Sequence, residues 1–185
     1  MAQKRFKIDG YGQLELNQVA FPRDGRIEAQ CALDPTDFEA IPAEVGMLLM
    51  VDNIARKIKL PVAGSIFPIA LNYSTEFMYD ERTQGLKHFK LEKDGIYPRL
   101  GYLAIGDKFT TNCLAYDDGE FADEEAVKEA YKGDAPLYGG VSESGAILVS
   151  ATAPTEGPVL LAIHGCGAGS MPDGQFAIQF QAIKA

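Results

Sequence analysis

The residues best suited to nucleophilic chemistry are His164 and Cys166, which a single glycine separates. A thiol becomes an effective nucleophile when a base lies within hydrogen-bond reach and a third group orients that base. The surrounding glycines predict a turn, so we do not expect the two side chains to share the face of one strand. A buried thiol beside a turn is therefore the favoured interpretation. A small β-barrel enzyme that uses His164 and Cys166 is kept as an alternative.

The other groups that could bind a metal are scattered or wrongly ordered. The sequence has two histidines and three cysteines, Cys31, Cys113 and Cys166, and their spacing matches no zinc site. The acidic run over 117–125 lacks the alternating ligands that an EF-hand places before its glycine. We interpret it as a solvated loop leading into a helix. We expect no cofactor, no metal and no disulfide framework, and free thiols suit assembly in a reducing cytoplasm.

Charge and hydropathy exclude two classes of partner. The 185 residues carry a net charge of −9, which opposes binding to the phosphate backbone of nucleic acids. The start of the chain is polar and basic rather than typical of a signal peptide. No apolar run reaches the ~18 residues that a membrane-spanning helix needs. Neither a nucleic-acid partner nor a membrane partner is expected.

The pattern along the chain is that of a mainly β protein. Short alternating segments are separated by Gly, Pro, Asn and Asp, which predicts an antiparallel β-barrel or sandwich. One short α-helix is predicted at about 123–132, with acids in its first turn and a glycine after its end. We expect a single β-rich domain over 19–185, with an irregular excursion near 74–96.

Residues 1–18 are predicted to form an N-terminal β-hairpin arm. Two alternating segments, 5–8 and 13–16, flank the turn sequence Asp-Gly-Tyr-Gly. Such an arm could pair within its own domain or add to the sheet of a neighbour. Its apolar side chains are the candidate interface: Phe6, Ile8, Tyr11, Leu14 and Leu16.

Four further segments carry specific strand predictions. Residues 47–51 form a continuous apolar run and are expected to pair in a hairpin with 56–60. Residues 66–73 are interrupted by Pro68, which favours an edge or bent strand over a central one. Residues 109–115 are predicted to form one strand. Residues 175–183 alternate most clearly, with Phe176, Ile178, Phe180 and Ala182 on one face.

Three stretches together resemble the head decoration, or capsid cement, proteins of tailed bacteriophages. They are Gly101–Asn112, with its Gly-Asp turn, Gly133–Tyr138 followed by Gly145–Leu148, and Met171–Phe180, with its Pro-Asp-Gly turn. The resemblance covers mainly residues 95–185. It implies a small β-rich virion protein, made in the host cytoplasm, that binds the major capsid protein on the outer surface of the capsid. It also implies self-association as a trimer or another small oligomer.

Other functions remain open from the sequence. A tail-tube or baseplate subunit would use the same strands to continue the sheet of a ring. A sugar- or receptor-binding module would use the aromatic residues Tyr73, Phe77, Tyr79 and Tyr97. The capsid decoration protein, which is not an enzyme, is the favoured hypothesis.

Overall fold

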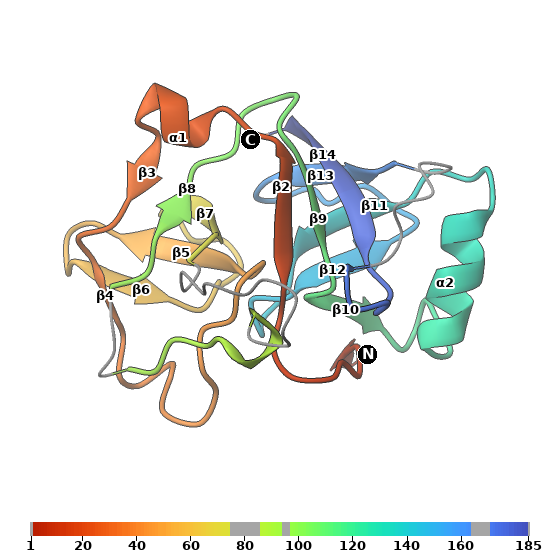
Figure 1. Ribbon diagram of the computed structural model, residues 1–185, viewed down its shortest axis with the longest axis horizontal. Coiled ribbons are helices and arrows are strands. Elements are labelled where there is room, and N and C mark those ends of the chain that lie inside the picture. The colour runs from red at the N-terminus through yellow and green to blue at the C-terminus, as the bar shows by residue number, and fades with distance from the viewer. Residues whose placement is uncertain (1, 75–85, 94–96, 164–170, 185) are drawn as a thin grey trace.

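The computed structural model describes residues 2–74, 86–93, 97–163 and 171–184, and within them short strands dominate. The architecture is mainly β and sandwich-like, with an eight-stranded and a six-stranded sheet lying side by side (Figure 1). The predicted fold class is thereby confirmed as the sandwich rather than the closed barrel. Among the described residues no helix is long and apolar enough to cross a bilayer.

The six-stranded sheet has the order β3-β8-β7-β5-β6-β4. Its strands all lie within residues 27–101: β3 (Ile27–Glu28), β4 (Ala32–Leu33), β5 (Leu48–Asp52), β6 (Lys57–Lys59), β7 (Ile69–Asn72) and β8 (Leu100–Gly101). The predicted hairpin of 47–51 with 56–60 is confirmed, because β5 and β6 pair antiparallel. Asp52 ends β5 and turns the chain by accepting hydrogen bonds from the amides of Ile54 and Ala55.

The prediction that 66–73 forms an edge or bent strand, and not a central one, is wrong about its place in the sheet. β7 lies inside the sheet, between β8 and β5. Pro68 lies just before the strand begins, so the absence of its N–H removes no hydrogen bond between strands. Its carbonyl oxygen still accepts a hydrogen bond from the amide of Val51 at 2.9 Å.

The eight-stranded sheet has the order β1-β10-β12-β11-β13-β14-β9-β2. Its strands are β1 (Gln3–Arg5), β2 (Leu14–Gln18), β9 (Lys108–Thr111), β10 (Leu114–Asp117), β11 (Tyr138–Val141), β12 (Ile147–Ser150), β13 (Val159–Ala162) and β14 (Ile178–Lys184). β10 and β12 pair in parallel and the other pairs are antiparallel. As predicted, Ile178, Phe180 and Ala182 are buried on one face of β14.

The eight-stranded sheet must curl strongly. β9 and β10 are five places apart in the strand order, which is ~24 Å in a flat sheet. The chain from Thr111 to Leu114 can span only ~11 Å. The two ends of the sheet therefore approach one another. The expected single strand over 109–115 is two strands, because the chain turns at Asn112 and Cys113 to reach the far side of the sheet.

The prediction of an N-terminal β-hairpin is also wrong. β1 pairs with β10 and β2 pairs with β9, so the two strands lie at opposite edges of one sheet. The residues between β1 and β2 connect the two opposite edges of the curled sheet.

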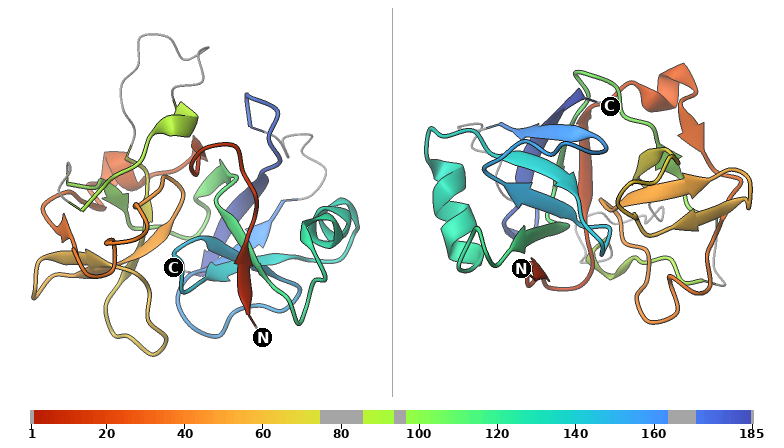
Figure 2. Two further views of the ribbon diagram at one scale, coloured as in Figure 1. Left: turned by 90° about the horizontal axis from the view of Figure 1, so that it is seen from below. Right: turned by 180° about the vertical axis from the view of Figure 1, so that it is seen from behind.

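Two helical elements of α type are described beside a short 3-10 turn, η1 (Leu86–His88). α1 (Phe21–Asp24) is a single turn, and α2 (Glu124–Lys132) is the predicted helix. Asp123 caps α2 by accepting a hydrogen bond from the amide of Ala126. Val127 and Tyr131 are buried against the eight-stranded sheet, and α2 lies on the side away from the six-stranded sheet (Figures 1 and 2).

Both hydrophobic clusters draw side chains from both sheets. The larger combines Phe109, Phe180 and Ile147 of the eight-stranded sheet with Leu48 and Leu71 of the other. The smaller sets Cys113, Ala115 and Ala146 against the inner side chains of the six-stranded sheet. The irregular excursion predicted near 74–96 falls largely outside the described residues, although Leu91 forms an isolated bridge with Ala43.

Candidate functional site

The candidate interface residues of the N-terminal segment pack mainly on their own domain. Phe6 is buried, with its ring against those of Tyr116 and Phe176. Ile8 and Leu14 pack on the larger cluster. Tyr11 is half-buried beneath the ammonium of Lys90. Leu16, on the outer strand β2, is the most exposed of the five.

The charged groups singled out in the sequence serve local structure. Within the acidic run, Asp118 binds Lys4 and the amide of Ala2, and Glu124 accepts from the amide of Lys7. These contacts fasten the first residues to the eight-stranded sheet. In the described part of the chain, no three His, Cys, Asp or Glu side chains are grouped so as to hold a metal ion.

The proposed catalytic pair and half of the aromatic set are not tested by the structure. His164 and Cys166 lie outside the described residues, as do Phe77 and Tyr79. Tyr73 packs against Phe21, with ring centroids 5.0 Å apart, and Tyr97 is exposed. The sugar- or receptor-binding alternative therefore stays untested.

A buried ion pair lies where the N-terminal strand meets both sheets. The guanidinium of Arg5 donates to both carboxylate oxygens of Glu44, at 2.6 and 2.9 Å, and also to Cys113 Sγ at 3.5 Å. Glu44 accepts a further hydrogen bond from the amide of Gly12. Burial acts to lower the pKa of Arg5, but the hydrogen bond to Glu44 and the adjacent charges raise it above its usual range. The pair is a structural junction in which the Glu44 side chain is only 6% exposed, while that of Arg5 is 30% exposed.

Burial raises the pKa of Cys113 to about 12. In the unfolded chain a thiol has a pKa near ~8.5, so the unfolded state loses this proton at lower pH than the folded state. The contribution of Cys113 to stability is complete below that pH and is lost as the pH rises toward the folded value. In a C31A/C166A background, the urea midpoint should fall between about pH 9 and 11, and the added C113A substitution should reduce the fall. Equal slopes with and without Cys113 would contradict this prediction.

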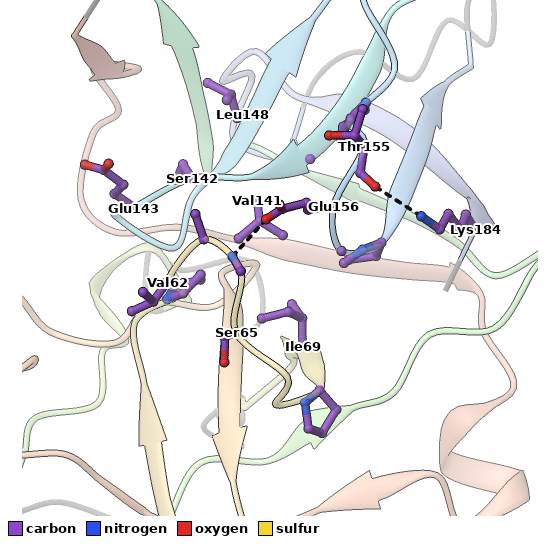
Figure 3. Close-up of a pocket in the computed structure, with 18 of the residues that line it drawn as sticks. Val62, Ser65, Ile69, Val141, Ser142, Glu143, Leu148, Thr155, Glu156 and Lys184 are labelled. Atoms are coloured by element: carbon purple, nitrogen blue, oxygen red, sulfur yellow. Dashed lines mark hydrogen bonds between the residues drawn. The ribbon is translucent and has the colours of Figure 1, made fainter.

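A groove with a volume of about 780 Å³ lies between the two sheets. The loop between β6 and β7 forms one wall, and the β11–β12 and β12–β13 loops form the other (Figure 3). Most of the lining is apolar: Pro61, Val62, Phe67, Pro68, Ile69, Leu103, Val141, Leu148, Pro154 and Pro158. This volume lies within the ~300–1,000 Å³ typical of binding sites.

The polar groups of the groove are engaged mainly with one another. Glu156 accepts a hydrogen bond from the amide of Gly64 at 2.9 Å, which links the two walls (Figure 3). Lys184 donates to the carbonyl oxygen of Thr155 at 3.3 Å. The Glu143 side chain is exposed and forms no hydrogen bond or ion pair with the residues that the structure describes.

Beside the groove, the apolar loop (residues 61–68) presents hydrophobic side chains to solvent. Ile66 is 92% exposed and Val62 is 64% exposed. Gly64 has a φ of 73°, which allows the loop to fold back on itself. Exposed apolar groups next to an apolar groove are typical of a surface that binds another protein. Such a surface can bury apolar area and attract a positive charge through Glu143 and Glu156.

This site was not predicted from the sequence. The available signal was a Pro-bounded, Gly-containing segment that nevertheless carries Val62, Ile66 and Phe67. Turn residues are usually polar, so apolar side chains in a turn indicate an interface.

Comparison with known proteins adds no relative from which to identify the site. No family model matches the sequence, and neither the curated proteins nor the solved structures include a significant match. The fold is β-sandwich-like, and an apolar groove lies between its two sheets.

Proposed function

We propose that this chain is a virion structural protein without enzymatic activity, which decorates the outer surface of a tailed-phage capsid. In this proposal the groove and the apolar loop bind the major capsid protein at the junctions between capsomers. The protein would be made in the host cytoplasm and would associate as a trimer or another small oligomer. The observation that carries the proposal is the exposure of Val62 and Ile66 beside a preformed apolar groove.

The stretches that resemble decoration proteins support the proposal through their conformation. Gly106, in the Gly-Asp turn, has a φ of 99°, and Asp107 accepts hydrogen bonds from the amides of Ala20 and Ala104. Gly174, in the Pro-Asp-Gly turn, has a φ of 84° and precedes β14. Each motif thus forms the turn-then-strand unit that the resemblance implies.

The mechanism of stabilisation is added interface area. Apolar surface removed from water contributes roughly 25 cal/mol per Å², so burial of the apolar loop favours binding. A shell repeats the same junction many times, and modest contacts made by each copy then sum through multivalency. The added contacts oppose the outward force of the packaged DNA.

A double substitution on the apolar loop tests the proposal. V62D/I66D should weaken binding to shells of the encoding phage assembled without this protein by more than about tenfold, because charges would enter an apolar interface. The melting temperature should stay near that of the wild type, because both side chains are exposed. Co-sedimentation with the shells measures binding.

The matched control is I54D/I105D, which changes two other highly exposed isoleucines outside the groove. This variant should bind shells like the wild type. If wild-type protein neither sediments with the shells nor raises their resistance to heat, the capsid proposal fails. If both double variants bind equally well, the apolar loop is not the contact surface.

A tail-tube or baseplate subunit is the second candidate, and the open sheet supports it. In the described residues the outer edges of β1 and β2 pair with no further strand. A neighbouring subunit could continue the sheet from either edge, as in a ring. Hexameric rings in negative-stain micrographs of the purified protein would favour this candidate over capsid decoration.

A further inference from the structure

The walls of the groove are suited to binding a peptide segment through its side chains and not through its backbone. Four of the lining residues are prolines: Pro61, Pro68, Pro154 and Pro158. Proline has no N–H group and a fixed φ, so these walls are stiff and offer few backbone donors. Neither β7 nor β12, the strands nearest the groove, has a free edge, because each is paired on both sides. Affinity must therefore come from apolar packing against side chains such as Val141, Leu148 and Ile69.

The link between the walls of the groove favours an extended occupant. The amide of Gly64 on one wall donates a hydrogen bond to Glu156 on the other, at 2.9 Å. A helix, about 10 Å across, would have to separate the walls at this point. An extended segment can insert alternate side chains into such a space without breaking that link.

The charge of the rim selects a basic occupant. Glu143 and Glu156 lie on the same wall, opposite Val62 and Ile69 (Figure 3). Glu143 has no partner among the described residues, and Glu156 uses one carboxylate oxygen for the amide of Gly64. The nearby cation, Lys184, is held by the carbonyl oxygen of Thr155. The net charge of −9 reinforces the attraction for a positive segment.

We propose that the groove binds an extended apolar segment of a partner protein, in which a lysine or arginine lies beside the inserted apolar side chains. The apolar side chains pack between the two walls, and the basic group lies at the rim that Glu143 and Glu156 make acidic. The inference rests on the proposed function in taking the groove as the docking site, and it adds the chemistry of the partner segment. A second copy of this acidic chain would bring like charge to the same rim.

Selection from a yeast-displayed library of random linear peptides tests this chemistry. The full chain is the bait, and peptides that also bind V62D/I66D are discarded. The enriched peptides should combine Leu, Ile, Phe or Pro with an adjacent Lys or Arg. Affinity for the E143Q variant should fall by about two- to fivefold, and E156Q should give a similar loss. Binding should also weaken as the salt concentration rises.

The controls distinguish the loss of a negative charge from a change in the structure of the groove. A glutamine at position 156 can still accept the hydrogen bond from Gly64, so the link between the walls is retained. E39Q neutralises an exposed glutamate outside the groove and should change nothing. Enriched peptides without basic residues, or with unchanged affinity for E143Q and E156Q, would overturn the inference. So would a dimer in analytical ultracentrifugation that V62D/I66D dissociates, because the occupant would then be a second copy.

Shell binding distinguishes this inference from the capsid proposal. If shells bind the wild type, E143Q and E156Q with the same affinity, the capsid proposal stands and the basic-segment inference fails. If the selected peptides behave as expected and no shell binds, the basic-segment inference stands and the capsid proposal fails.

Discussion

Replacing Arg5 with alanine is expected to lower the free energy of unfolding by about 3–5 kcal/mol, which is the usual cost of leaving a buried charge without its partner. The side chain of Glu44 is only 6% exposed and is held by two hydrogen bonds from Arg5. In R5A the amide of Gly12 would be the remaining donor to this carboxylate. Urea denaturation followed by circular dichroism measures the loss.

Two further variants distinguish the cost of leaving a buried charge unpaired from the cost of simply removing a charge. K4A removes an exposed ion pair with Asp118, at 3.4 Å, and should cost less than about 1 kcal/mol. R5M/E44Q removes both charges while keeping an acceptor for Gly12, so it should recover most of the stability lost in R5A. An R5A variant no less stable than K4A would show that the junction contributes little.

Gly46 is the second position where a large loss is expected. Its φ is 89°, and an added Cβ would lie 2.3 Å from Thr111 Oγ1 and 3.1 Å from Cys113 Cβ. Thr111 cannot easily turn away, because its hydroxyl donates to the carbonyl of Gln13 and accepts from the amide of Cys113. G46A should therefore cost about 2–5 kcal/mol, combining ~1–2 kcal/mol of backbone strain with ~1–3 kcal/mol of overpacking.

Gly106 provides a control with the same backbone requirement. Its φ is 99°, but an added Cβ would meet nothing within 4 Å. G106A should therefore show only the backbone cost of ~1–2 kcal/mol. The difference between the two variants in urea unfolding measures the packing cost at Gly46. Equal losses would mean that the neighbours of Gly46 move aside freely.

Features governed by neighbours in the sequence could be predicted. The helix at 124–132 carries its cap and its buried face within ten residues, and the β5–β6 hairpin has its turn between its strands. The burial of alternate residues on β14 follows from the period of two that defines a strand. In these elements the local preference and the final fold agree, so the pattern is sufficient.

Features governed by distant pairing could not be predicted. The segments that become β1 and β2 have the pattern of a hairpin, but the curled sheet offers each a different partner. Likewise, the run over 109–115 contains no signal that its second half belongs on the far side of the sheet. The pairing of a strand depends on contacts with segments many residues away, which a local pattern does not encode.

The candidate site was missed for a related reason. Apolar side chains are interior by default, so Val62 and Ile66 gave no sign of exposure on their own. Their surroundings, two prolines and a Gly-Ser turn, place them on a surface loop. The interface residues predicted in the N-terminal segment illustrate the opposite error, since Phe6 is buried in the core.

The strand order also sets a sequence of events during synthesis. All six strands of the smaller sheet lie within residues 27–101, so these strands can pair early as the chain leaves the ribosome. The larger sheet has β14 between β13 and β9, and it stays divided until residue 184 has emerged. Until then β2, near the start of the chain, can pair only with a β9 whose second neighbour, β14, is still missing. Nascent chains stalled before β14 should therefore be sensitive to protease in the larger sheet and protected in the smaller one.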